Sequence, residues 1–207
     1  MRVVRVLLLC LMACLAAGSA WAIELAGSVI RLQGSALATG GTGFSRPLQE
    51  GSTLLVGDRV STGPGSRLAL RMTDGGQLTL GSASSITIDT WDASPTEGRA
   101  TLGLVEGVVL ATSGAIARLG PDRMVINTPV AVLGVRGTEV WVQSLEDRLA
   151  VAMFSGTGVS VTTGDRTVEL TQPDSGVDVV AGEPLPDPKP WGAPRLEQAR
   201  QDVAFTE

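Results

Sequence analysis

Residues 68–88 read LALRMTDGGQLTLGSASSITI, and this stretch decides the fold class. Apolar residues occupy every second position of 68–72, of 78–80 and of 86–88, and Asp-Gly-Gly at 74–76 separates the first two groups. Alternation with a period of two is typical of half-buried β-strands, and Asp-Gly is a strong turn signal between paired strands. The stretch therefore predicts short antiparallel strands joined by glycine turns.

The same spacing recurs along most of the chain. Apolar pairs begin eight residues apart at Leu70, Leu78 and Ile86, and a second series at steps of eight or nine begins at Val151, Val159, Val168 and Val177. Such a step equals a strand of five or six residues plus a short turn. We therefore expect an all-β domain over residues 23–182, with short Gly-turned strands in a solenoid-like or meander/sandwich stack.

The composition excludes most catalytic chemistry. The chain has no His and no Tyr, and its two Cys lie within the first 22 residues. Ser-His-Asp triads, Cys nucleophiles and His or Cys zinc sites need those side chains. The acidic groups at Asp89, Asp92 and Glu97 fit a solvated loop better than a glycosidase, and Asp174 to Asp178 offers too few oxygens for calcium. We predict a protein that is not an enzyme and has no catalytic, cofactor or metal site.

The first 22 residues are typical of a signal peptide. Arg2 and Arg5 precede an apolar run of about 12 residues, and Ala20 and Ala22 give the small-x-small pattern of a cleavage site. The run is shorter than the roughly 20 residues of a spanning helix, and no later stretch could span either. A lipoprotein signal ending at Cys14 is the alternative. We expect a periplasmic or secreted protein without a transmembrane segment in its mature form.

Cleavage after Ala22 would leave 14 basic residues against 21 acidic residues. Nucleic-acid-binding proteins carry clustered positive charge. This acidic balance therefore argues against nucleic acid as a partner.

The composition changes at Glu183. Five prolines fall between 184 and 194, which predicts an extended Pro-rich linker over 183–194. Residues 195–207 are expected to form a short helical or disordered tail, either frayed or docked on a partner or on the domain itself. Trp191, within the linker, is expected to be exposed and able to anchor a partner.

Two further stretches resemble a known family. The first is LLVGDRVST at 54–62, which is followed by the Asp-Gly turn at 74–76. The second is INTPVAVLGVRGTEVWV at 126–142. Together they resemble the FecR family, whose periplasmic domain has a Gly-Asp segment, an Asp-Gly turn and a Thr-Pro…Val-Arg-Gly-Thr signature. The resemblance covers roughly residues 23–181.

The resemblance implies a β-rich sensing or interaction domain. The type members are inner-membrane regulators that relay the occupancy of an outer-membrane receptor to a sigma factor. They carry a sigma-binding segment and a membrane helix before the domain and a receptor-docking module after it. The present sequence departs from that pattern at both ends, so the sigma-regulator function is not carried over directly.

The motif residues are predicted to be structural. Thr128-Pro129 should start an extended segment, because proline cannot donate to a sheet ladder. Arg136 stands in an apolar run and should be buried against a carboxylate such as Glu139 or a turn aspartate; the alternative is an outward Arg136 that captures an anionic ligand. The predicted motif positions are Gly57, Asp58, Thr128, Pro129, Val135, Arg136, Gly137 and Thr138.

The sequence as a whole favours an exported scaffold that binds an unknown envelope protein or a cell-wall glycan, by a sheet edge or an exposed sheet face. The alternative is a sensor or regulator of envelope or iron-uptake signalling that acts in trans with a membrane partner.

Overall fold

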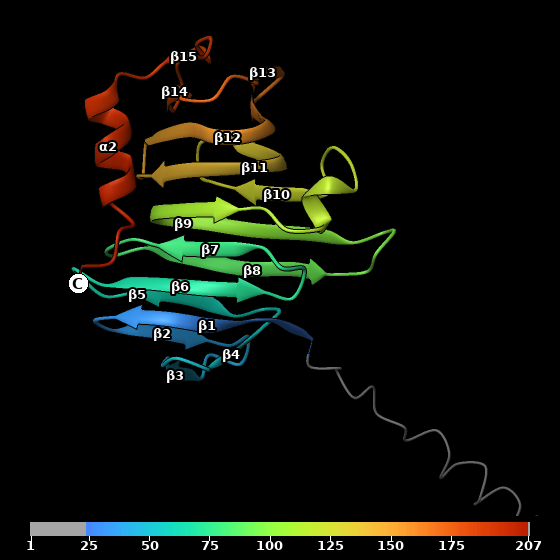
Figure 1. The fold of residues 1–207 in the computed structure, drawn as a ribbon, viewed down its shortest axis with the longest axis vertical. Coiled ribbons are helices and arrows are strands. Elements are labelled where there is room, and N and C mark those ends of the chain that lie inside the picture. Colours follow the sequence, from blue (N-terminus) through green and yellow to red (C-terminus); the bar gives the residue numbers. More distant parts are fainter. Residues whose placement is uncertain (1–23, 207) are drawn as a thin grey trace, which may run out of the picture.

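The computed structural model describes residues 24–206 (Figure 1). The predicted signal peptide, with Cys14, Ala20 and Ala22, lies outside the described residues. Fifteen strands pair into one sheet, and the strands are stacked side by side along the long axis of the molecule. The prediction of a β-rich fold is confirmed, and one short α-helix, α2 (Ala193–Gln201), accompanies the strands.

Strand pairing divides the sheet into two layers that share three long strands. One layer, called here the helix-side layer, contains β1 (Leu25–Gln33), β4 (Thr53–Leu55), β6 (Arg67–Met72), β7 (Gln77–Leu80), β14 (Ser175–Val180) and β15 (Lys189–Pro190). The other, called the far layer, contains β2 (Ala36–Thr39), β3 (Ser45–Pro47), β5 (Arg59–Thr62), β8 (Ser85–Asp92), β10 (Met124–Asn127) and β13 (Arg166–Leu170).

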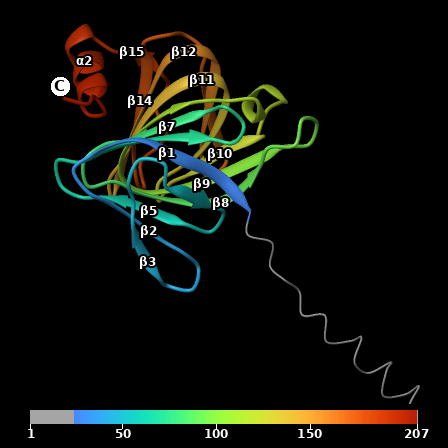
Figure 2. The same ribbon diagram turned by 60° about the horizontal axis from the view of Figure 1, so that its bottom comes forward.

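The three long strands, β9 (Arg99–Thr112), β11 (Val132–Ser144) and β12 (Arg148–Thr163), bend from one layer into the other. The first part of β9 pairs with β8 and β10, and its second part pairs with β7 and β11. The bend falls at Gly107, where φ is +92°. Figure 2 shows these strands curving around the interior. The layers are thus joined by continuous strands as well as by turns.

The sheet is mixed and does not close into a barrel. Among the described strands, β9 and β10 form the parallel pair and the other pairings are antiparallel. Of the predicted arrangements, the described residues form a two-layered stack and no solenoid.

The main core lies between the two layers. It is built almost wholly from Leu, Val, Ile, Ala and Met side chains of both layers, and Trp91 is its large aromatic member. Inward positions alternate with outward ones along each strand, as in Val140 and Val142 on either side of Trp141. The period of two therefore separates this core from a second cluster on the outer surface.

The second apolar cluster lies outside the helix-side layer, beneath α2 (Ala193–Gln201). Outward residues of the long strands, such as Trp141 and Phe154, pack there against Leu196 and Val203. Trp191 also belongs to this cluster and is only 6% exposed. The expectation that Trp191 is exposed is therefore wrong, because its ring fills the space beside Trp141 in an edge-to-face contact.

Within residues 24–206, no helix combines the length and the hydropathy needed to cross a membrane. The predicted domain boundaries at 182 and 194 stay predictions.

Candidate functional site at the Val-Arg-Gly-Thr corner

The segment Val135 to Thr138 forms the corner at which β11 passes from the far layer to the helix-side layer. Before the corner β11 pairs with β10, and after it β11 pairs with β9. Val135 is fully buried in the core, Gly137 has a φ of +55°, and Thr138 is 3% exposed. The Val-Arg-Gly-Thr motif therefore forms the bend at which β11 crosses from one layer to the other.

The neighbouring strand β12 bends at the same level, at Gly156. Its φ is +111°, and a Cβ there would lie 2.2 Å from the Gly137 carbonyl oxygen and 2.5 Å from the Thr138 Cα. Only glycine adopts this backbone conformation and leaves that space free. The register between β11 and β12 also shifts between Glu139 and Val140. The two bent strands therefore nest against one another.

The Thr138 hydroxyl group joins the two bent strands. It accepts a hydrogen bond from the Gly158 amide at 3.0 Å, and it lies 2.7 Å from the Arg136 carbonyl oxygen and 3.0 Å from that of Gly158. The Thr138 amide donates to the Ser113 hydroxyl at 2.7 Å. Buried polar groups are stable only when they are paired in this way. Thr138 is thus the central polar residue of the corner.

Arg136 is not buried, contrary to the expectation from its apolar neighbours. Its side chain is 34% exposed and forms an ion pair with Glu169 of β13, not with Glu139 or a turn aspartate. The reason is strand alternation, since Val135 points into the core and Arg136 therefore points outward. The ion pair on the outer surface of the far layer then tethers β11 to the edge strand.

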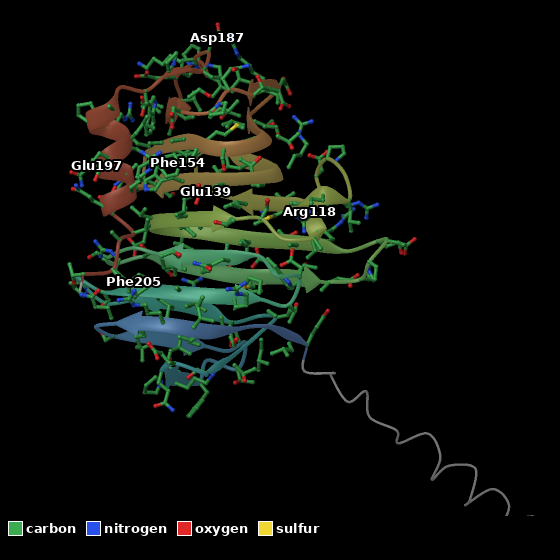
Figure 3. The ribbon with its side chains drawn as sticks, in the orientation of Figure 1. Arg118, Glu139, Phe154, Asp187, Glu197 and Phe205 are labelled. Carbon is green, nitrogen blue, oxygen red and sulfur yellow. The ribbon has the colours of Figure 1, made fainter. Side chains whose placement is uncertain are left out.

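Two polar clefts flank the corner. One, of about 330 Å³, is lined by Thr112, Ser113, Arg118, Gly137, Thr138, Glu139, Ser155 and Thr157. The other, of about 240 Å³, is lined by Pro121, Asp122, Gly134, Arg136, Ser160, Thr167 and Glu169. In Figure 3 Arg118 lies at the η2 (Ile116–Arg118) side of the molecule, away from α2 and its Glu197. Both clefts offer hydroxyl and charged groups for hydrogen bonding, and neither offers an apolar chamber.

Thr128 and Pro129 lie elsewhere, in the turn between β10 and β11. The Thr128 hydroxyl accepts from the Ala131 amide at 2.9 Å and lies 2.8 Å from the Ala131 carbonyl oxygen. The extended segment begins at Val132, so the expectation that Thr128-Pro129 itself starts a strand is wrong. The threonine side chain closes the turn, and the proline occupies its exposed part.

Gly57 and Asp58 form a third, separate location between β4 and β5. Gly57 has a φ of +88° and donates its amide to the Ile88 carbonyl oxygen at 2.7 Å. The Asp58 side chain is 2% exposed and accepts from both terminal nitrogens of Arg46 and from the Leu55 amide. The hydrogen bond to Asp58 raises the pKa of the Arg46 guanidinium. The Arg46 side chain is 31% exposed, so the pair joins a buried carboxylate to a half-buried guanidinium and ties β3 to the turn between β4 and β5.

Further acidic residues have structural partners. Asp92 accepts from the Ser94 amide at 2.9 Å in an exposed turn. Asp174 and Asp178 lie against Arg200 and Arg195 of α2. The described residues contain no cluster of three metal-ligating side chains.

The corner and the Asp58 pair together frame the part of the chain that matches a known family. The family model described as FecR protein matches residues 58–158, from the buried aspartate to the glycine bonded by Thr138. The chain carries a FecR family domain. Within this FecR domain, the motif residues form turns, a strand corner and one buried carboxylate, that of Asp58, whose partner Arg46 precedes the matched segment.

Two crystal structures of a proposed anti-sigma factor from Parabacteroides distasonis ATCC 8503 share the fold. Each match has a TM-score of 0.55 and 17% sequence identity, and covers 67% of this chain and 62% of that chain. The present chain therefore matches less than two thirds of the length of the chain in those structures. A comparison with curated protein sequences found no match.

Sequence reasoning missed the partners that complete each motif. Arg46 pairs with Asp58, Ser113 with Thr138, and Glu169 with Arg136, at separations of 12, 25 and 33 residues. The sequence contains no local signal for such pairs. Only the strand pairing places them together.

Proposed function

We propose that this protein is a FecR-type sensor or regulator domain that acts by binding another protein in the cell envelope. The observation that carries the proposal is the FecR match over residues 58–158, in a fold shared with a proposed anti-sigma factor. Members of that family are generally regulators without enzymatic activity. A predicted leader at residues 1–22 would bring the domain to the periplasm or the cell surface, where it would act in trans with a membrane-bound partner.

The surface chemistry supports a protein partner. The clefts beside the corner are lined by hydroxyl and charged side chains, which suits hydrogen bonding to a protein surface better than enclosure of an apolar small molecule. At the corner, the Thr138 hydroxyl group bonds β11 to β12 and Gly156 lets the two strands approach closely, so the groups around the corner are tied to both strands. A fixed polar surface lowers the entropy lost when a partner binds.

A second candidate is an envelope scaffold that binds cell-wall glycan. The observation that favours it is the hydroxyl-rich lining of the larger cleft, where Thr112, Ser113, Ser155 and Thr157 surround Arg118 and Glu139. Hydroxyl and charged groups of this kind can hydrogen-bond to sugar hydroxyls.

Envelope crosslinking distinguishes the two candidates. The full chain with a photoreactive residue in place of Thr157, beside the corner, is expected to crosslink to one membrane-associated protein. A matched probe in place of the exposed Thr96, in the loop between β8 and β9, serves as the control. Recovery of wall glycan in place of a protein would support the scaffold, and equal crosslinking from both probes would contradict a specific site at the corner.

A further inference from the structure

The outer surface of the helix-side layer carries an apolar strip under α2. Val108, Trp141, Ala152 and Phe154 form this strip, which we call the helix platform. These residues alternate with core residues along β9, β11 and β12. Their side chains therefore point away from the main core. Large apolar side chains at outward positions indicate a surface that something covers.

Two glycines shape the platform for a closely approaching chain. A Cβ on Gly176 would lie 2.4 Å from the Trp191 Cε2 atom, and one on Gly81 would lie 2.8 Å from the Asp202 carbonyl oxygen. Both distances are shorter than real Cβ contacts. The platform therefore has one slot for an aromatic ring that precedes α2 in the sequence and a second slot for backbone that follows it.

Two acidic side chains beside the platform complement a basic helix. Asp178 forms a two-point ion pair with Arg195, and Asp174 lies 3.6 Å from Arg200. The same arginines stack on aromatic rings, Arg195 over Trp191 at 3.4 Å and Arg200 over Phe154 at 4.6 Å. An acidic rim beside aromatic rings thus recognises arginine in two ways.

The resident helix has little stability of its own. It is nine residues long, its N-terminal Gly192 provides no side-chain cap, and a Pro-rich segment connects it to β14. A helix of this length is marginal in water without tertiary contacts. Its structure therefore depends on the platform. Beyond the helix, Phe205 contacts Arg31 and the Thr206 amide donates to the Gln33 side chain, both on β1.

We infer that the helix platform is a docking surface for a basic amphipathic helix with an aromatic anchor, and that α2 is the occupant that a helix of a partner protein replaces. This inference rests on the proposed function, because it names the surface through which a regulator would be engaged. A tethered occupant acts at an effective concentration of about millimolar. A partner helix displaces α2 from the platform only if it binds more tightly than α2 or is present at high local concentration.

The test uses the full chain with an added copy of its own segment as the probe. Trp191→Ala with Leu196→Asp weakens the resident helix and leaves every platform residue unchanged. A fluorescent peptide of residues 189–206 is titrated into this variant and into the wild type, and anisotropy is read. We expect saturable 1:1 binding by the variant and binding at least tenfold weaker by the wild type.

Two controls make the result specific to the platform. Adding Trp141→Ala to the variant removes the ring that Trp191 contacts edge to face and should weaken peptide binding at least tenfold, and so should Trp191→Ala in the peptide. Circular dichroism verifies that each chain is folded; if the double variant is not, Leu196→Asp alone takes its place, with the same expected order of affinities. No saturable binding by a folded variant, or binding that Trp141→Ala leaves unchanged, overturns the inference. Neither outcome depends on finding the envelope partner, so failure here is distinct from failure of the proposed function.

Discussion

Replacing Thr138 by valine tests the polar corner, because valine keeps the shape of threonine and removes only the hydroxyl group. The Gly158 amide, bonded at 3.0 Å, and a carbonyl oxygen at 2.7–3.0 Å then lose their partner in a buried place. An unsatisfied buried group costs about 1–3 kcal/mol. We expect the free energy of unfolding to fall by about 2–4 kcal/mol, which corresponds to roughly 5–15 °C in Tm for a domain of this size.

Urea denaturation followed by tryptophan fluorescence and circular dichroism measures this change. Thr138→Ser keeps the hydroxyl group and should recover most of the lost stability. Thr162→Val is the matched control, because the Thr162 hydroxyl group bonds only to that of Thr167 on the exposed surface. Its effect should stay within about 0.5 kcal/mol. If Thr138→Val is as stable as the control variant, the reasoning about the corner is refuted.

Three further predictions concern other contacts. Gly156→Ala should cost more than about 2 kcal/mol in urea denaturation, since it adds a clash to backbone strain, whereas Gly164→Ala, with open space around it, should cost about 1 kcal/mol; equal costs would contradict the nested corner. Arg136→Met should change the free energy of unfolding by less than about 1 kcal/mol, since its ion pair is exposed; a loss of several kcal/mol would show that it is buried. Arg195 lowers the pKa of Asp178, so this contact stabilises α2 above the unfolded carboxyl pKa of about 3.9 and is lost as the pH falls through the lower folded value. Trp191 emission should therefore shift to the red in acid, and Asp178→Asn should remove that part of the shift; an unchanged acid response in Asp178→Asn would contradict it.

The strands could be predicted because their signal is local. Alternation at 68–72 and 78–80 and the Asp-Gly turn at 74–76 each lie within a few residues, and β6 and β7 follow them closely. The family motif was also recognisable, because Val135 to Thr138 is a continuous segment. The structural role of the motif could not be predicted, since its corner forms only when β9, β11 and β12 lie side by side.

The errors at Arg136 and Trp191 have related causes. The apolar neighbours of Arg136 predict a buried side chain, but the period of two within β11 places it opposite Val135, on the surface. The prolines around Trp191 predict an exposed ring, but the ring packs against the backbone of Gly176 on β14, where no side chain intervenes. Neither outcome can be inferred from composition, because each depends on which surface a distant strand presents.

The claim that this FecR domain belongs to a regulator is tested most directly by transcription. The gene is deleted, messenger RNA is sequenced, and the deletion strain is complemented with the wild-type chain. We predict that a small group of genes with a common promoter element changes in the deletion strain and returns to its original level on complementation. A deletion strain whose transcripts match those of the parent, under conditions in which the protein is made, would contradict the regulatory account.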